Sequence, residues 1–207
     1  MHLARIPGLG SLLFRDALCR INESDKKVAY LTFDDGPIPE VTPTILDILS
    51  KYGVKATFFC VGDNVRKHPE IFQRLIKEGH TIGNHTFHHM DGWKASDENY
   101  ISDIAQCAEL VKSNLFRPPY GRLKFSQYKR VKEKYKIVLW DVLSGDYDMS
   151  LSGQKCFEIV KKNTRPGSIL VFHDNIKAQN KISELLTKTL DYMGDSGYML
   201  KPLSSTI

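Results

Sequence analysis

The sequence has few cysteines and no long apolar run. Its four cysteines are far apart and form no Cys-x-x-Cys pair: Cys19, Cys60, Cys107 and Cys156. Domains stapled by disulfides are much denser in cysteine, so we interpret these residues as free thiols. No segment approaches the roughly 18 consecutive apolar residues that a membrane-spanning helix requires. These absences argue against a small disulfide-rich domain and against a membrane span.

A convincing secretion signal is also lacking. Residues 6–14 are uncharged, but Pro7, Gly8 and Gly10 interrupt them and no clear small-residue cleavage site follows. We expect residues 1–25 to form an N-terminal strap packed on a domain that spans residues 26–207. On this basis we expect a cytoplasmic protein, with export left open.

The composition is typical of a single globular domain. Of 207 residues, 42% are hydrophobic and 26% charged, and no linker or low-complexity tract divides them. The formal charge of +5 is compatible with a polyanionic partner but does not require one. No nucleic-acid motif accompanies it, so we expect no nucleic-acid partner, and we expect a monomer.

Apolar runs alternate with amphipathic stretches along the whole chain. We predict seven strands, at residues 28–33, 56–61, 81–84, 115–118, 136–142, 168–172 and 198–203. We predict six helices between them, at residues 42–52, 69–78, 97–112, 125–135, 150–162 and 181–193. Thr42, followed by Pro43, is predicted to cap the first helix. Such alternation predicts an α/β fold with parallel strands, either a barrel or an open doubly wound sheet.

Polar residues lie at or just past the C-terminal ends of the predicted strands. They are Asp34, Asp35, His85, Arg117, Asp146 and His173. In a βα barrel the active site is built on that face, from the ends of different strands. A barrel gathers these residues around one axis more readily than an open sheet, so their placement favours a barrel.

The run VAYLTFDDGP ends in two adjacent carboxylates, Asp34 and Asp35. Successive side chains of a strand point to opposite faces, so both can enter one site only where the backbone turns. Gly36 is expected to permit that turn. Two carboxylates at the mouth of an apolar strand need a cation, a shared proton or water. The alternative is a solvated Asp-Asp turn.

The segment HTFHH contains three histidines, His85, His88 and His89. Imidazoles at i and i+4 can lie on one side of a helical turn and bind one metal ion, which fits His85 with His89. The spacing leaves His85 with His88 as a competing pair. One carboxylate with two histidines is a common ligand set for a catalytic divalent ion.

Three further segments carry chemistry. The two prolines of RPPYG stiffen a loop that can aim Arg117 at a carboxylate. Trp140 precedes Asp146 and Tyr147 in a fourth segment. His173 follows an apolar strand, where an imidazole is well suited to act as a general acid or base. Each segment alone also fits a structural role.

Together the segments TFDDGP, HTFHH, RPPYG, the region of Trp140 to Tyr147, and LVFH resemble the polysaccharide deacetylase family, carbohydrate esterase family 4, in the family's own order. The resemblance runs from about Val28 to the C-terminus. It implies a distorted (β/α)7-type barrel in a single domain and an N-acetylated carbohydrate substrate.

The resemblance also implies roles for individual residues. The metal ligands would be Asp35, His85 and His89, and the ion would be zinc, with cobalt and nickel as alternatives. The catalytic residues would be Asp34 as general base, Arg117 holding it, His173 as general acid, and Asp146 tuning His173. The substrate-binding residues would be Pro119, Tyr120 (whose backbone N–H would face the oxyanion), Trp140, Tyr147 and Leu170.

Two positions depart from the family pattern. Leu143 stands where the family usually has an Asp, and Tyr147 where it usually has a Trp. Both concern the pocket wall, so O-acetyl xylan or a formamido sugar are alternative substrates. A carbohydrate-binding module without turnover is the alternative outside enzymes. Residues 122–136 carry seven basic residues against one Glu, for which we expect solvated charges and at most weak contact with an anionic polymer or lipid head groups.

Overall fold

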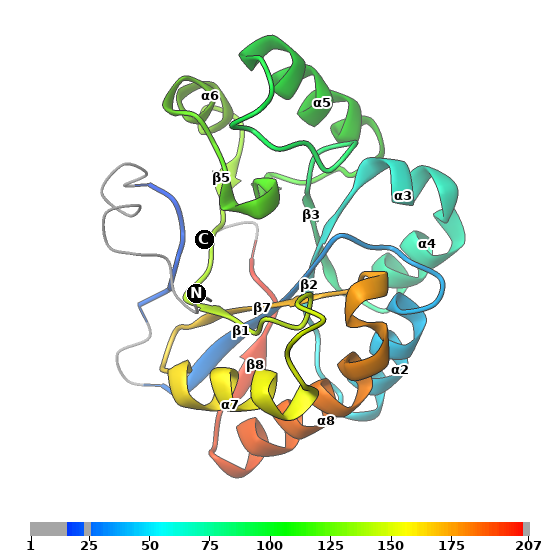
Figure 1. The fold of residues 1–207 in the computed structure, drawn as a ribbon, viewed down its shortest axis with the longest axis vertical. Coiled ribbons are helices and arrows are strands. Elements are labelled where there is room, and N and C mark those ends of the chain that lie inside the picture. Colours follow the sequence, from blue (N-terminus) through cyan, green and yellow to red (C-terminus); the bar gives the residue numbers. More distant parts are fainter. Residues whose placement is uncertain (1–15, 23–25, 205–207) are drawn as a thin grey trace.

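In the computed structural model, which describes residues 16–22 and 26–204, helices surround a curled sheet on three sides (Figure 1). The strands are β1 (Val28–Asp34), β2 (Thr57–Cys60), β3 (Thr81–Asn84), β4 (Leu115–Phe116), β5 (Lys136–Ile137), β6 (Val142–Leu143), β7 (Ile169–His173) and β8 (Met199–Lys201). The helices are α2 (Thr42–Lys51), α3 (Gly62–Lys67), α4 (Pro69–Lys77), α5 (Asp97–Leu110), α6 (Phe125–Val131), α7 (Gly153–Asn163) and α8 (Gln179–Asp195).

The sheet has the order β5-β4-β3-β2-β1-β7-β6, and β8 pairs with the beginning of β1. Every pairing between these strands is parallel. Parallel strands connected by helices bury both faces of the sheet. The α/β prediction and the distorted (β/α)7-type barrel are therefore confirmed.

The predicted strand over residues 136–142 is two strands. β5 pairs with β4, whereas β6 pairs with β7. Between them the chain crosses the open side of the barrel: the Val138 N–H donates to the carbonyl of Phe116, but the Asp141 N–H donates to that of Ile169. The prediction of one strand was wrong because an apolar run reports burial, not which neighbouring strand it pairs with.

Side chains of β1 alternate between the barrel interior and the surrounding helices. Tyr30 packs in the interior cluster, whereas Leu31 and Phe33 belong to the larger core beneath the helices. Thr32 and Asp34 share the interior face with Tyr30, because alternate residues of a strand face the same side. This alternation places Asp34 at the mouth of the barrel.

The helices differ from prediction in three details. The short α3 was not predicted, and α6 ends at Val131 rather than near residue 135. Thr42 is the first residue of α2 and not its cap. Its hydroxyl instead donates to Asp174 Oδ2 at 2.7 Å and accepts from the Ile38 N–H at 2.8 Å. A tertiary contact has thus taken the hydroxyl that local pattern assigned to capping.

Residues 16–22 lie on the side of the sheet that carries no helix (Figure 1). Leu18 pairs with Val138 and Arg20 with Ser168, so this segment borders the crossing between β5 and β6. Residues 1–15, 23–25 and 205–207 lie outside the described part of the chain. Most of the predicted strap and its boundary fall among these residues. The strap therefore stays a prediction.

Two further predictions concern the described residues. All four cysteines lie among them and are free thiols. None of the helices in these ranges is long and apolar enough to cross a bilayer.

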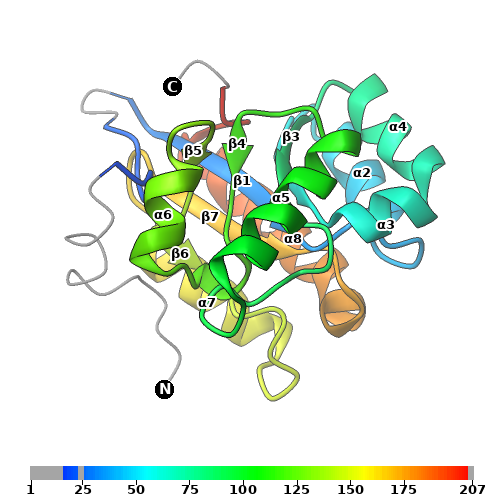
Figure 2. The same cartoon turned by 90° about the horizontal axis from the view of Figure 1, so that it is seen from above.

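Seen from above, α5 and α6 lie beside each other over one end of the sheet (Figure 2), with their apolar side chains in a third buried cluster.

Candidate active site

The carboxyl ends of β1, β3 and β7 open into a cavity of about 740 Å³. Most of the predicted site residues line it: Asp34, Asp35, His85, His89, Tyr120, Trp140, Tyr147 and His173. Two more predicted residues, Arg117 and Asp146, are fully buried directly behind the cavity wall. Sequence positions separated by more than a hundred residues thus meet at one mouth of the barrel.

Asp34 is held from behind by the buried guanidinium of Arg117. Arg117 Nη1 donates to Asp34 Oδ1 at 2.6 Å and to Thr32 Oγ1 at 2.8 Å. Arg117 Nε and Nη2 donate to the carbonyls of Val138 and Leu139, where the chain crosses between β5 and β6. Burial lowers the pKa of Arg117, and the charge of Asp34 opposes that shift. One cation therefore orients the carboxylate and satisfies carbonyls at the gap in the sheet.

Asp35 turns the chain back into the cavity. Its φ of 92° is a left-handed conformation that costs energy for a residue with a Cβ. The turn was expected at Gly36, but Gly36 is needed for a different reason. A Cβ on it would lie 1.8 Å from Asp174 Oδ2, and its N–H donates to Asp174 Oδ1. Burial favours the neutral form of Asp35, but His85, His89 and the charge of His173 hold its pKa well below the usual value.

His85 and His89 face Asp35. The Nε2 atoms of His85 and His89 lie 3.5 Å and 3.0 Å from Asp35 Oδ1. His85 Nδ1 donates to the carbonyl of Arg117 at 2.7 Å, which leaves Nε2 as the atom with a lone pair. Together the three residues offer one oxygen and two nitrogens, all within 4.8 Å of one another. That donor set fits a divalent transition metal with further positions open for water.

The structure resolves the competition between His88 and His89. His88 Nδ1 lies 2.5 Å from Asp103 Oδ1, and the side chain is 58% exposed. The backbone of His88 also donates to Asp103. Residues 85–89 form an irregular loop with positive φ at Thr86 and His89, not the helical turn expected from the i, i+4 spacing. The structure thus brings His85 and His89, not His88, to Asp35, and the helical turn expected for them is absent from this loop.

His173, the last residue of β7, is paired with Asp146. Asp146 accepts from the His173 backbone N–H and from its Nδ1, both at 2.7 Å. Burial lowers the pKa of the imidazole, but Asp146 outweighs it and raises the pKa to about 9. The ring of Tyr147 contacts the imidazole edge-on, with centroids 5.0 Å apart. His173 is therefore protonated at neutral pH and presents Nε2 to the cavity.

The RPPYG loop positions Tyr120 beside the histidines. The ring of Tyr120 lies 4.7 Å from that of His89. The turn is closed by the backbone N–H groups of Gly121 and Arg122, which donate to the carbonyls of Pro118 and Pro119. The backbone N–H of Tyr120 is not used by these bonds. A Cβ on Gly121 would lie 2.6 Å from the indole of Trp140, so this glycine lets Trp140 form part of the wall.

Two predicted substrate-binding residues do not line the cavity. Leu170 is fully buried in the core beneath the helices, and Pro119 is buried within the RPPYG loop. On β7 it is Val171 that faces the cavity with His173. Leu170 was placed one residue out of register, and a slip of one residue moves a strand side chain to the opposite face.

Sequence reasoning missed two residues that follow His173. Asn175 Nδ2 donates to Asp35 Oδ2 at 2.6 Å and thereby leaves Oδ1 facing the histidines. Asp174 is buried behind Gly36, and burial raises its pKa to about 7. Their position directly after a predicted strand, beside a predicted acid, was the signal that could have indicated them.

The fold and the site define a class: a distorted βα barrel with an Asp-His-His cluster that fits a divalent metal, flanked by two buried ion pairs. Residues 21–137 match the family described as Polysaccharide deacetylase. A peptidoglycan-N-acetylglucosamine deacetylase of Bacillus cereus is 34% identical over 191 residues, 89% of this chain and 90% of that protein. A chitooligosaccharide deacetylase of Azorhizobium caulinodans is 36% identical over 164 residues, 75% of this chain and 77% of that protein.

A solved structure shows the same likeness in three dimensions. It is a peptidoglycan N-acetylglucosamine deacetylase in complex with 4-naphthalen-1-yl-N-oxidanyl-benzamide, with a TM-score of 0.87 and 32% identity, covering 93% of this chain and 94% of that one. The chain belongs to the polysaccharide deacetylase family, carbohydrate esterase family 4. The family resemblance is confirmed, and with it an enzyme of the amide hydrolase class.

Proposed function

We propose that the protein is a metal-dependent deacetylase that removes N-acetyl groups from oligo- or polysaccharides containing N-acetylglucosamine. The convergence of Asp35, His85 and His89 in one cavity with Asp34 and His173 carries this proposal. The activities for which its relatives are named, on peptidoglycan and on chitooligosaccharide, support the substrate class.

Asp35, His85 and His89 would hold the divalent ion, and zinc suits one carboxylate and two imidazoles. When bound, the ion supplies Lewis acidity and lowers the pKa of a coordinated water towards about 7. Asn175 and the carbonyl of Arg117 fix the orientation of two ligands, Asp35 and His85, before any ion binds. Such outer contacts raise metal affinity because the ligands lose little freedom on binding.

Asp34 is placed to accept the proton of the attacking water. It lies at the cavity mouth beside Asp35, and its Oδ1 is occupied by Arg117. The other carboxylate oxygen, Oδ2, is then the one that would take the proton. The buried guanidinium limits the rotation of the Asp34 carboxylate, which keeps it in place to act as a general base.

Two groups would act on the tetrahedral intermediate. The N–H of Tyr120 would donate to the oxyanion, and its left-handed φ of 60° sets the direction of that N–H. His173 would donate its Nε2 proton to the departing amine, because Asp146 accepts from Nδ1 and stabilises the charged imidazolium. After this step Asp34 holds the proton taken from water and His173 lacks the proton given to the amine, so transfer of one proton from Asp34 to His173 through solvent returns both to their starting states.

The wall beside His173 is apolar and would hold the methyl group of the acetyl. Leu143 and Val171 line the cavity there, together with the rings of Trp140 and Tyr147. Leu143 stands where an acidic residue was expected from the family pattern, so this wall has lost a charge. An uncharged acyl group is thereby favoured over a charged one.

Acetate release from N-acetylglucosamine oligomers tests the proposal. Protein stripped with a chelator should be inactive, and added zinc or cobalt should restore release in wild type but not in Asp34→Asn. Absence of release by protein shown to contain metal would exclude the N-acetyl substrate. Failure to bind metal would exclude the assignment of Asp35, His85 and His89.

A further inference from the structure

A row of flat side chains leads from the Asp-His-His cluster to the rim of the cavity. The ring of Tyr120 lies 4.7 Å from that of His89, and the guanidinium of Arg122 stands 5.5 Å from the Tyr120 ring. Arg122 also stands 5.1 Å from the indole of Trp93. Tyr120 and Arg122 line the cavity, whereas Trp93 continues the row outside it.

The outer part of this row is exposed although its backbone is firmly held. Trp93 is 60% exposed, an unusual state for an indole. Asp91 accepts from the backbone N–H of Trp93 through Oδ1 and from Arg122 Nη1 through Oδ2. Gln127 donates to the carbonyl of Gly92, and a Cβ on Gly92 would lie 2.5 Å from the Arg122 carbonyl. The loop is thus packed to present the indole, not to bury it.

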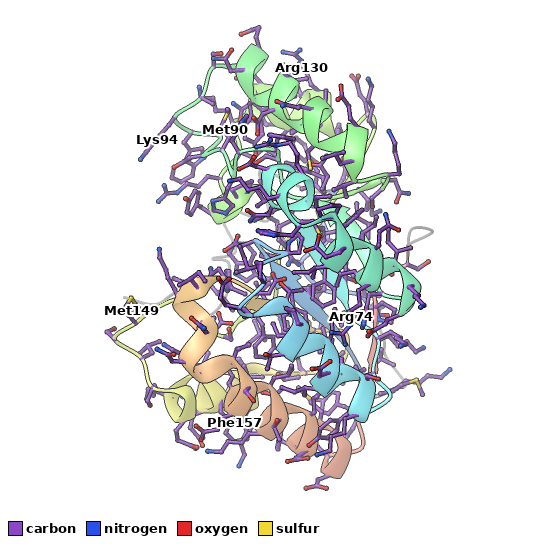
Figure 3. The ribbon with its side chains drawn as sticks, turned by 90° about the vertical axis from the view of Figure 1, so that its right-hand side faces the viewer. Arg74, Met90, Lys94, Arg130, Met149 and Phe157 are labelled. Atoms are coloured by element: carbon purple, nitrogen blue, oxygen red, sulfur yellow. The ribbon has the colours of Figure 1, made fainter. Side chains whose placement is uncertain are left out.

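Arg122 has donor capacity left. Among the described side chains, Asp91 accepts a hydrogen bond from Arg122 Nη1 at 2.7 Å. A guanidinium carries five N–H groups, and its planar edge matches the two oxygens of a carboxylate. Lys94, whose side chain is exposed in the same loop, adds a second positive charge near this rim (Figure 3).

We propose that Trp93 and Arg122 form an outer subsite for the sugar unit next to the one that is deacetylated, and that this unit carries a carboxylate. The apolar face of the pyranose would lie on the indole, because an exposed aromatic ring offers a large rigid contact area at little entropic cost. The carboxylate would accept from Arg122. This inference rests on the proposed function, because the row leads away from the reacting sugar only if the acetamido group of that sugar lies beside Asp35.

Figure 3 locates the loop that carries Trp93 by its labelled neighbour Lys94. Lys94 lies on one side of the open edge of the molecule, and Met149 projects from the other side. Arg130 lies away from this edge, on the outer end of the α5 and α6 layer. Arg130 is exposed and 3.8 Å from Glu98, so Arg130→Gln removes the same charge as Arg122→Gln without touching the row.

The test uses binding to the metal-loaded Asp34→Asn protein, measured by calorimetry. The ligands are an N-acetylated oligosaccharide whose neighbouring sugar carries a carboxylate, and the same molecule with that carboxylate reduced to an alcohol. The background protein should prefer the carboxylated form by about fivefold, as expected for a partly exposed ion pair. Adding Arg122→Gln should abolish that preference, and adding Arg130→Gln should keep it.

Trp93 is tested on the same pair of ligands. Trp93→Ala should weaken both forms by a similar factor, and Trp93→Phe should restore most of the affinity. The inference is overturned if Arg122→Gln keeps the preference, if Arg130→Gln loses it equally, or if Trp93→Ala binds both forms unchanged. Thermal unfolding of each variant checks that the loop has not been disrupted.

Failure of the subsite and failure of the proposed function are distinguishable. Wild-type protein that releases acetate from a neutral oligomer, with variants that bind both ligands alike, retains the function and rejects the subsite. Wild-type protein that releases no acetate, but whose binding preference depends on Arg122, rejects the function. In that case the row would belong to a carbohydrate-binding surface, and Trp93 and Arg122 would not contact a sugar next to a reacting one.

Discussion

The two sides of the cavity are organised by different means. On the metal side, consisting of Asp35, His85, His89 and Tyr120, the backbone itself is unusual. All positive-φ residues other than glycine in the described part of the chain lie on or beside it: Asp35, Thr86, His89 and Tyr120. On the proton side, Asp34 and His173 end regular strands that pair with each other in register.

The difference indicates how each side is kept in place. Left-handed conformations cost about 1–3 kcal/mol each and persist only where surrounding contacts determine them. For Asp35 these contacts are hydrogen bonds from Asn64 to its carbonyl and from Asn175 to its carboxylate. The proton side relies on two buried ion pairs, Asp34 with Arg117 and His173 with Asp146. The metal side is thus shaped by unusual backbone conformations, whereas the proton side is held by buried ion pairs between regular strands and their neighbours.

The largest expected effect is loss of a metal ligand. His85→Ala should lower metal affinity by more than about 100-fold and activity by at least about 1,000-fold, because one of three protein ligands is lost. Metal content by elemental analysis and acetate release measure this. His88→Ala is the matched control, since His88 pairs with Asp103 and should retain bound metal. Equal loss in both variants would contradict the assigned ligand set.

The proton side should fail by loss of stability when its cation is removed. Arg117→Leu leaves Asp34 buried without its partner and should lower the free energy of unfolding by about 3–5 kcal/mol. Urea titration measures this. Arg117→Lys should not restore stability, because an ammonium cannot reach Asp34, Val138 and Leu139 together. The double variant Asp34→Asn, Arg117→Leu should be more stable than Arg117→Leu alone.

The second ion pair sets the pH dependence. In the proposed mechanism His173 acts in its protonated form, and its pKa is raised to about 9, so activity should be present below that pH and lost as pH rises through it. Asp146→Asn removes the charge that raises this pKa. It should lower kcat by about 10- to 100-fold and move the alkaline limb of the profile to lower pH by at least about one unit. A bound divalent ion shifts the pKa of His173 in the same direction in wild type and in Asp146→Asn, so the two profiles can be compared.

Stability should follow the same pair with a defined sign. The folded pKa of His173 lies above its ordinary value of 6.5, so the pair stabilises the fold fully below pH 6.5 and this contribution disappears as pH rises through about 9. Asp146→Asn should lack this component. A wild-type alkaline limb that Asp146→Asn leaves in place would show that another group controls the profile.

The smallest effect is expected from an outer contact on the metal side. Asn175→Ala removes the hydrogen bond to Asp35 Oδ2 and should weaken metal binding by about 10-fold, without changing the position of the alkaline limb. Chelator competition measures the affinity. Asn175→Asp places a second carboxylate against Asp35, and its effect on metal affinity distinguishes loss of orientation from change of charge.

Much of the site followed from local pattern. The run ending at Asp34 predicted a buried strand with carboxylates at its C-terminal end, and that is where β1 ends. Alternating apolar segments predicted parallel strands and helices, and polar residues after strands predicted one shared mouth. Period and position along the chain are local properties, so an isolated sequence carries them.

What the sequence by itself determined was therefore the order of elements and the side-chain chemistry brought to the barrel mouth. Only the tertiary structure decided which histidine pairs with Asp35, because the loop of residues 85–89 depends on the distant Asp103. It also decided that the chain crosses between β5 and β6 and that Asn175 reaches Asp35. Each of these depends on a neighbour far along the chain, and a contact between distant residues leaves no mark on local periodicity.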